Sequence, residues 1–231
     1  MRALGDRIRT RGQARVEARI RARTDDLHTT AVIRQAAALC LHYPDEGFHA
    51  RVPLLRAALA RVPGPAADRL TAFLDDVCAR PPAELAAHYV TVFDLRNRRS
   101  LYLSWWREGD TRRRGAALVN FKQVYREHGL EFIGAELPDF LPAVLEFAAT
   151  GGPSAAAAGT ALLCEHRPGI ELLRFALLDA DTPYAGVLEA VCATLPGASP
   201  GDRAQARALA RAGPPREDVG LDSYRAPGVG R

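Results

Sequence analysis

The stretch ADRLTAFLDDVCARP, residues 67–81, indicates the fold class of the chain. Its apolar residues recur at positions i, i+3, i+4 and i+7, which places them on one side of an α-helix. These residues are Leu70, Phe73, Leu74 and Val77. The acidic pair Asp75 and Asp76 is expected on the solvated side, and Pro81 and Pro82 follow where such a helix has to end. The stretch therefore predicts an amphipathic helix that buries one face in a core.

The same helical period recurs along most of the chain, and no alternation of strands and helices appears. Asp110 and Ser154 are the expected N-caps of two helices. Val52 and Pro53 are expected to break the segment 45–61 into two pieces. Helices are expected over 30–43, 67–80, 83–95, 110–129, 154–167, 169–179 and 182–195. The sequence thus predicts an all-α fold, a single helical bundle of about eight helices over residues 27–196.

The two ends of the chain differ from the middle in composition. Residues 1–26 form an arginine-rich arm, with eight arginines in the first 23 residues against only Asp6 and Glu17. Residues 197–231 form a tail rich in proline and glycine. We expect both ends to be mobile. The arm carries the excess behind the formal net charge of +4, so an alternative function as a nucleic-acid-binding regulator would depend on the arm alone.

Several classes of protein are disfavoured by what the sequence lacks. No apolar run reaches the roughly 18 residues of a membrane-spanning helix, and the amino terminus lacks the apolar core of a secretory signal. We therefore expect a cytoplasmic protein without stable membrane association. The phosphate-binding, zinc-protease and serine-hydrolase motifs GxGxxG, GxxxxGK[ST], HExxH and GxSxG are also absent, so the chain is not expected to be an enzyme.

The four cysteines are expected to be buried thiols, because they are widely separated and lie among apolar neighbours. Cys40 and Cys164 each stand two residues before a histidine, His42 and His166. On a helix, positions i and i+2 point to different faces, so these pairs are not expected to share a metal ion. The sequence predicts no metal site.

The segment SLYLSWWREGDTRRRG, residues 100–115, contains both tryptophans of the chain side by side. Adjacent residues of a helix cannot point the same way, so we expect one tryptophan near a surface or groove. Partly exposed aromatic side chains are typical anchors for a bound peptide, although two core tryptophans are an equally open interpretation. The arginines at 112–114 are expected to have acidic neighbours, for which Asp94 and Asp110 are candidates.

Four stretches resemble, in this order and spacing, the NarJ family of dedicated assembly chaperones of respiratory nitrate reductase. They are YVTVFD (89–94), SLYLSWWREGDTRRRGAAL (100–118), VYREHGL (124–130) and ELPDFLPAVLEF (136–147). The stretch LCLHYPDEGF (39–48) also resembles the family's first helix and its exit turn. The resemblance covers about residues 30–195, and the wider group contains the TorD and DmsD chaperones of molybdoenzymes. The arginine-rich arm lies outside the family pattern.

This resemblance implies an all-helical chaperone with no catalytic activity. Family members bind the amino-terminal, signal-like segment of the apo catalytic (alpha) subunit of nitrate reductase. They hold that subunit in the cytoplasm until the molybdenum bis-guanine-dinucleotide cofactor and an iron–sulfur cluster are inserted. The resemblance implies no stably bound cofactor and no nucleic acid partner.

A receptor for a peptide with an apolar face and a few cations needs an apolar groove with acids at its rim. We expect Glu136 and Asp139 to be those acids, and Asp139 also to cap the helix that follows. A purely structural role for both acids is the alternative. The TorD branch reads E-P-x-D-H here, whereas this chain has Leu137 after the acid and Phe140 in place of the histidine, so the detailed mechanism is not carried over. The candidate binding residues are Asp94, Tyr102, Trp105, Asp110, Tyr125, Glu136, Asp139, Phe140, Leu141 and Val144.

Overall fold

A computed structural model describes residues 24–95 and 97–212 of the chain. Within these residues every regular element is helical, and the β-type contact recorded is an isolated antiparallel bridge between Tyr102 and Phe140. The predicted all-α fold is confirmed. The arginine-rich segment up to residue 23 and the end of the tail from residue 213 lie outside the described residues.

The described residues form eleven α-helices, more than the expected eight, because short helices add to the long ones. A π-helical turn, η1 (Val90–Asp94), continues α4, and a 3-10 turn, η2 (Asn97–Arg99), follows it. The α-helices are a first helix over 24–41, α2 (Glu46–Leu59), α3 (Pro65–Cys78), α4 (Pro82–Tyr89), α5 (Trp105–Glu108), α6 (Arg112–Glu127), α7 (Leu141–Thr150), α8 (Gly152–Glu165), α9 (Arg167–Leu178), α10 (Tyr184–Ala193) and α11 (Arg203–Ala212).

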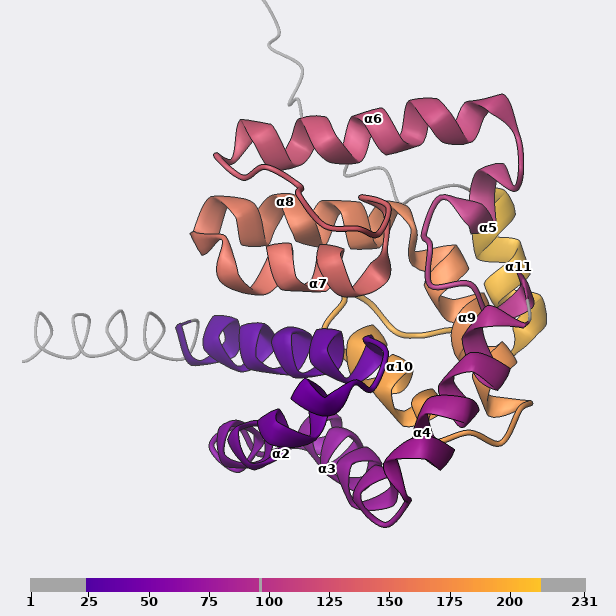
Figure 1. Ribbon diagram of the computed structural model, residues 1–231. Helices are drawn as coiled ribbons and strands as arrows, with labels where there is room; N and C mark the ends of the chain where they lie inside the picture. Colours follow the sequence, from indigo (N-terminus) through magenta and orange to yellow (C-terminus); the bar gives the residue numbers. More distant parts are fainter. Residues whose placement is uncertain (1–23, 96, 213–231) are drawn as a thin grey trace, which may run out of the picture.

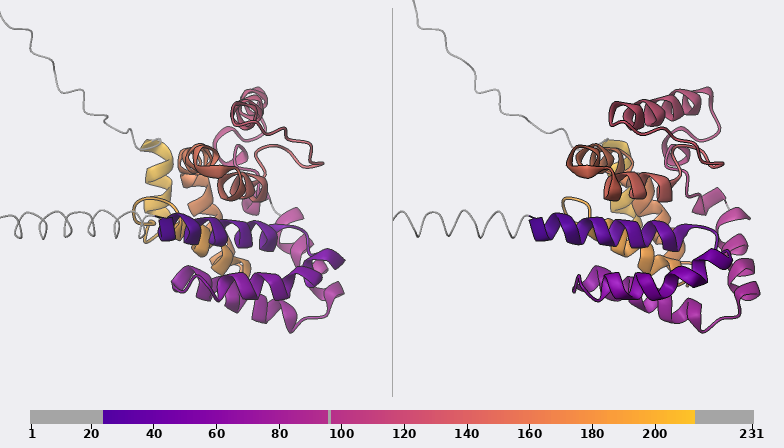
Figure 2. Two further views of the ribbon diagram at one scale, coloured as in Figure 1. Left: turned by 90° about the vertical axis from the view of Figure 1, so that its left-hand side faces the viewer. Right: turned by 60° about the vertical axis from the view of Figure 1, so that its left-hand side comes forward.

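The helices stack in tiers, which both Figure 1 and Figure 2 show. The helices α2 and α3 form one end, the first helix crosses above them, α7 and α8 follow, and α6 is outermost. The helix α10 packs on α3 and on α9, and α9 in turn packs on α11. The pair α7 and α8 is close because Gly159 has no side chain: a Cβ there would lie 2.6 Å from the Cβ of Ala148.

The apolar face predicted in the stretch 67–81 is the buried face of α3. Leu70 and Leu74 are fully buried, and Phe73 and Val77 are almost fully buried. Phe73 packs on Tyr184 of α10 with a ring-centroid distance of 5.0 Å. The helical spacing therefore identified both the element and the side that joins the core.

Three predicted helix boundaries were wrong. The segment 45–61 is not broken at Pro53, because α2 buries residues on both sides of the proline, Val52 and Leu55 among them, and this packing outweighs the local cost. Asp110 does not cap α6, which begins at Arg112 after Thr111. The helix α8 begins at Gly152, with Pro153 in its first turn, so it starts ahead of Ser154.

The tail predicted from residue 197 contains a helix, α11, that packs on α9. A buried ionic cluster holds the connection that leads to it. Glu171 is fully buried between two guanidinium groups, with Nε of Arg167 at 3.3 Å and Nε of Arg174 at 2.8 Å. Arg167 also donates to the carbonyl oxygens of Pro196 and Gly197, and Arg174 donates to that of Pro200 at 2.9 Å. These bonds fix the path of 196–200 and thereby position α11.

Across residues 24–95 and 97–212, no helix has both the length and the hydropathy needed to cross a bilayer.

Candidate functional site

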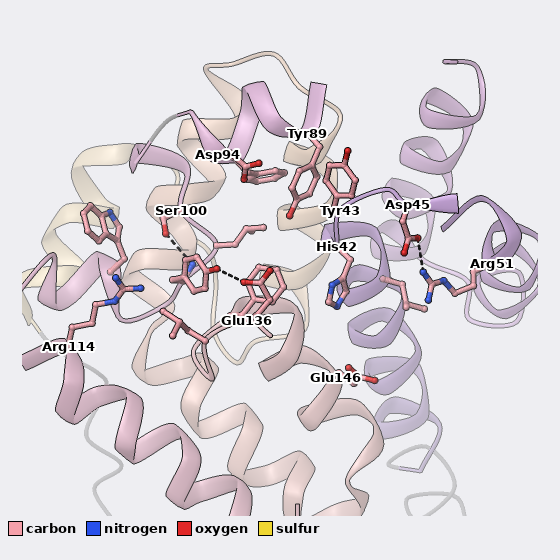
Figure 3. A pocket seen from close by; sticks show the side chains of 17 residues that line it. His42, Tyr43, Asp45, Arg51, Tyr89, Asp94, Ser100, Arg114, Glu136 and Glu146 are labelled. Atoms are coloured by element: carbon pink, nitrogen blue, oxygen red, sulfur yellow. Dashed lines mark hydrogen bonds and ion pairs between the residues drawn. The ribbon is translucent and has the colours of Figure 1, made fainter. Parts of the chain in front are cut away.

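A cavity of about 1000 Å³ opens between the first helix, the end of α4, the segment 100–105 and the start of α7. Figure 3 shows the side chains that line it, from elements far apart in the sequence. Four acidic residues line it, Asp45, Asp94, Glu136 and Glu146, against two basic residues, Arg51 and Arg114. We call it the acid-lined groove.

The floor of the acid-lined groove is apolar and aromatic. Tyr89 and Phe93 from α4 and its π-helical turn are buried, with ring centroids 4.9 Å apart. The hydroxyl of Tyr89 donates to the carbonyl oxygen of Leu41 at 3.1 Å, which joins α4 to the end of the first helix. Phe140 and Leu101 complete the buried surface. The groove therefore combines an apolar floor with charged side chains around it.

A short antiparallel pairing brings the segments 101–103 and 139–141 together. The amide of Leu103 donates to the carbonyl oxygen of Asp139 at 2.9 Å, and the amide of Leu141 donates to that of Leu101 at 2.8 Å. Tyr102 and Phe140 are the bridge pair, with ring centroids 5.5 Å apart. Two stretches singled out in the sequence thus form one wall of the groove, although 38 positions separate the bridge partners.

Asp139 is fully buried and supports this wall from behind. Its Oδ2 accepts from the backbone amide of Ser104 at 3.0 Å and from the Ser104 hydroxyl at 2.5 Å. Nε of Arg114 donates to the same hydroxyl oxygen at 3.3 Å. The expectation that Asp139 lies at an exposed rim was wrong. It does not cap α7 either, because the N-cap is Phe140.

Glu136 is exposed and accepts a short hydrogen bond from the hydroxyl of Tyr102. Partial burial, followed by the hydrogen bond to Glu136, raises the pKa of Tyr102 above its ordinary value. The phenol is therefore a neutral donor over the physiological range. The guanidinium of Arg114 lies 5.6 Å from the centroid of the Tyr102 ring and 5.8 Å from that of Trp105. These contacts hold the aromatic wall at the edge of the groove.

The carboxylates around the groove differ in how far they are already satisfied. Asp45 accepts from the amide of Phe48 at 2.8 Å and pairs with Arg51 at 3.3 Å. Asp94 and Glu146 are exposed, and among the described residues neither makes an ion pair. Figure 3 shows these two acids on opposite sides of the groove. The groove therefore has an excess of negative charge that is available to a cationic ligand.

His42 lines the groove and touches Phe140 edge-on, with ring centroids 5.5 Å apart. Burial is the main cause that lowers the pKa of His42, and the positive charge of Arg51 lowers it further. The carboxylates of Glu146, Glu136 and Asp45 act on this pKa in the opposite direction without outweighing burial. The imidazole is therefore neutral at pH 7.

The structure brings five of the ten candidate residues to the acid-lined groove: Asp94, Tyr102, Trp105, Glu136 and Phe140. The other five do not line it. Asp139, Leu141 and Val144 are fully buried, and Tyr125 is buried with its hydroxyl 2.7 Å from the carbonyl oxygen of Pro138. Asp110 is exposed outside the groove, and no ion pair joins it or Asp94 to the arginines at 112–114.

Sequence reasoning missed His42, Tyr89, Phe93 and Glu146 as groove residues. The first three lie within stretches that carry the family resemblance, so a signal existed for them. Glu146 also lies within such a stretch, ELPDFLPAVLEF, but on a helix an exposed acid beside an apolar face is the ordinary pattern, so nothing singled it out. Over the described ranges, no group of three or more His, Cys, Asp or Glu side chains is placed to hold a metal ion.

The fold and the groove can now be set beside known proteins. A family profile described as "Nitrate reductase delta subunit" matches residues 53–190, more than half of the chain. The chain therefore belongs to this family.

Three relatives show what this chain is similar to. The nitrate reductase-like protein NarX of Mycobacterium tuberculosis is 42% identical over 163 residues, 71% of this chain and 24% of NarX, so the chain spans about a quarter of that relative. The probable nitrate reductase molybdenum cofactor assembly chaperone NarJ of Bacillus subtilis is 30% identical over 161 residues, 69% of this chain and 86% of the relative. The corresponding chaperone NarJ of Escherichia coli K12 is 33% identical over 148 residues, 63% of this chain and 61% of the relative. The resemblance to the NarJ family is confirmed.

Proposed function

We propose that this protein is an assembly chaperone for a respiratory nitrate reductase. In the cytoplasm it would bind the amino-terminal segment of the apo catalytic subunit in the acid-lined groove. It would hold that subunit until the molybdenum cofactor and an iron–sulfur cluster are inserted, and then release it. The observation that carries this proposal is the groove itself, an apolar floor with excess carboxylates in a chain whose relatives include two NarJ chaperones.

The chemistry of the groove matches a peptide with an apolar helical face and a few cations. The apolar face would cover Tyr89, Phe93 and Phe140, which all line the groove. The cations would approach Asp94 and Glu146, two exposed acids that line the groove and form no ion pair within the described residues. The role proposed for the groove is binding alone.

Pre-organisation supports the same role. The wall at 101–103 is hydrogen-bonded to 139–141, and Asp139 anchors Ser104 from behind. A groove that is already ordered loses little conformational entropy when a peptide binds, so more of the contact energy appears as affinity.

The test is a binding titration with a synthetic peptide that copies the amino-terminal segment of the organism's own nitrate reductase catalytic subunit, about 15 to 20 residues or roughly 22 to 30 Å as a helix. Reversing both free acids, Asp94→Arg with Glu146→Arg, is expected to weaken binding by about tenfold or more, because each reversal replaces an attraction by a repulsion. The matched control reverses two exposed acids outside the groove, Glu84→Arg with Glu131→Arg, and is expected to bind like the wild type.

If the groove variant and the control variant bind the peptide with equal affinity, the acids of the groove do not take part in peptide recognition. If the wild-type protein does not bind the peptide, and an affinity pull-down from cells respiring on nitrate recovers no nitrate reductase catalytic subunit, the chaperone proposal itself is wrong.

A further inference from the structure

A second cavity, of about 530 Å³, lies on another part of the molecule and has the opposite charge. Four arginines line it, Arg98, Arg99, Arg203 and Arg207, against the single carboxylate of Asp179. We call it the arginine groove. None of its residues lines the acid-lined groove.

Three of these guanidinium groups have no carboxylate partner within the described chain. Arg203 pairs with Asp179, and this contact accounts for the one acid present. No ion pair is formed by Arg98, Arg99 or Arg207. Like charges gathered without a counter-charge repel one another, so the arrangement favours an anion from outside the chain.

The arginines come from two distant elements that meet on α9. The turn η2 brings Arg98 and Arg99 to one side of α9, and α11 brings Arg203 and Arg207 to another. Arg203 and Arg207 are four positions apart, so they share one face of α11. Ala206 of the same helix is fully buried, and the cluster around Glu171 fixes the connection that precedes α11. The spacing of the arginines is therefore set by the fold and not by an external ligand.

The remaining walls of the arginine groove are apolar and include an indole ring. Trp106 is half-buried, and its Nε1 donates to the carbonyl oxygen of Ser100 at 3.0 Å. It sits close against α9 because Gly169 has no side chain: a Cβ there would lie 2.5 Å from the Cβ of Trp106. Leu172 and Ala176 of α9 form the floor. A held aromatic ring beside several guanidinium groups suits a ligand that has both a planar ring and anionic groups.

We propose that the arginine groove binds a small ligand of the nucleoside diphosphate class. Guanidinium groups match phosphate oxygens in a two-pronged geometry, and a terminal phosphate carries about −1.5 to −2 charges at pH 7. Two linked phosphates therefore balance the three unpaired arginines, while the base lies against Trp106. The volume lies within the range of roughly 300 to 1,000 Å³ typical of small-molecule sites. This proposal does not depend on the function assigned to the acid-lined groove.

The experiment measures binding of adenosine diphosphate, guanosine diphosphate and inorganic pyrophosphate to the full chain by calorimetry. The double variant Arg98→Gln with Arg207→Gln is expected to weaken nucleoside diphosphate binding at least tenfold, because two charge-assisted contacts are lost. Both arginines are exposed, so the fold is expected to survive, which circular dichroism checks. Arg113→Gln, an exposed arginine of α6 outside the groove, is the matched control and is expected to bind like the wild type.

Fluorescence provides a second readout. In a Trp105→Phe background Trp106 is the remaining tryptophan, and a nucleoside diphosphate is expected to quench it where pyrophosphate does not. Equal binding of pyrophosphate and the nucleoside diphosphates, without quenching, would overturn the role of the ring. Binding that survives in the double variant, or no binding to the wild type, would overturn the site. If none of the three ligands binds and a glutamate-rich peptide binds in an arginine-dependent way, the arginine groove is a protein-docking surface and not a nucleoside diphosphate site.

Discussion

The acid-lined groove and the arginine groove differ in charge, in floor and in the way they are built. The first is walled by a β-type pairing between 101–103 and 139–141, and aromatic rings form its floor. The second is built where the turn η2 and the helix α11 both pack on α9, and aliphatic residues of α9 form its floor. Outside the arm the chain is almost neutral overall, yet its described part presents two concentrated and opposite fields. Net charge alone would have concealed both.

One short segment contributes to both grooves. Asp94 faces the acid-lined groove, and Arg98, four residues later, faces the arginine groove. Trp105 lines the first and Trp106 the second. The adjacent tryptophans line different grooves, and of the two it is Trp106 that also packs against the core, while Trp105 lies at a groove, as expected for one of the pair. The following predictions test how independent the two grooves are, from the largest expected effect to the smallest.

Glu171→Gln should have the largest effect on stability. It should loosen α11, the helix that carries two arginines of the arginine groove. Removing the charge leaves Arg167 and Arg174 buried without their counter-ion, which is expected to lower the free energy of unfolding by about 3 kcal/mol. Urea unfolding measures the loss. Hydrogen exchange should accelerate in α11 while the amides of Leu103 and Leu141 keep their protection. Glu165→Gln, which breaks an exposed pair with Arg107, is the control and should cost well under about 1 kcal/mol. Equal losses in the two variants would contradict the assignment.

Asp139→Ala should destabilise the acid-lined side instead. The amide and hydroxyl of Ser104 lose their acceptor in a buried place, which is expected to cost about 2 kcal/mol. The measurement is again urea unfolding, with peptide and nucleotide binding followed in parallel. Peptide affinity should fall and nucleoside diphosphate affinity should not. Asp110→Ala removes an exposed carboxylate outside both grooves and serves as the control.

Alkaline pH should weaken the fold through buried tyrosines. Burial raises the pKa of Tyr125 above its ordinary value of 10.0. The unfolded chain then releases its phenolic proton first, so the stabilisation is complete below pH 10 and is lost as the pH rises above it. The expected loss is up to about 1.4 kcal/mol for each pH unit for this residue. Burial acts in the same direction on the pKa values of Tyr89 and Tyr184.

Urea unfolding over this pH range checks the prediction, and Tyr125→Phe should make the decline shallower. An equally steep decline in that variant would contradict it. Arginine does not lose its proton in this range, so nucleoside diphosphate binding should stay flat until unfolding begins.

Tyr102→Phe should have the smallest effect. Its hydroxyl bonds to Glu136 at an exposed position, so the expected loss in the free energy of unfolding is at most about 1 kcal/mol. Thermal unfolding measures it. Tyr43→Phe, at the same groove and without a recorded hydroxyl bond, is the control and should change nothing measurable. A loss above about 2 kcal/mol would mean that this contact, and not Asp139, holds the wall.

The sequence predicted the helical class and the buried faces because both follow from local spacing. It also indicated Asp94, Tyr102, Trp105, Glu136 and Phe140, which the fold brings together at one groove. It misplaced Asp139, since the burial of that carboxylate depends on Ser104, 35 positions earlier, and no local pattern carries such a contact. It missed α11 and the arginine groove for the same reason: the anchoring bonds to Pro196 and Pro200 come from α9.

The π-helical turn at Val90–Asp94 has a consequence for chain length. Its closing bond runs from the amide of Leu95 to the carbonyl oxygen of Val90 at 3.2 Å, which spans five residues in place of the usual four. Deleting one residue there would restore an ordinary α-turn and leave the buried side of α4 in place. If the same residues formed an ordinary α-turn without any deletion, the side chains at its end would lie about 100° further around the helix axis. The position of Asp94 therefore depends on the number of residues in the turn more than on their identity, and an insertion or deletion at this point would change which side chain the groove presents.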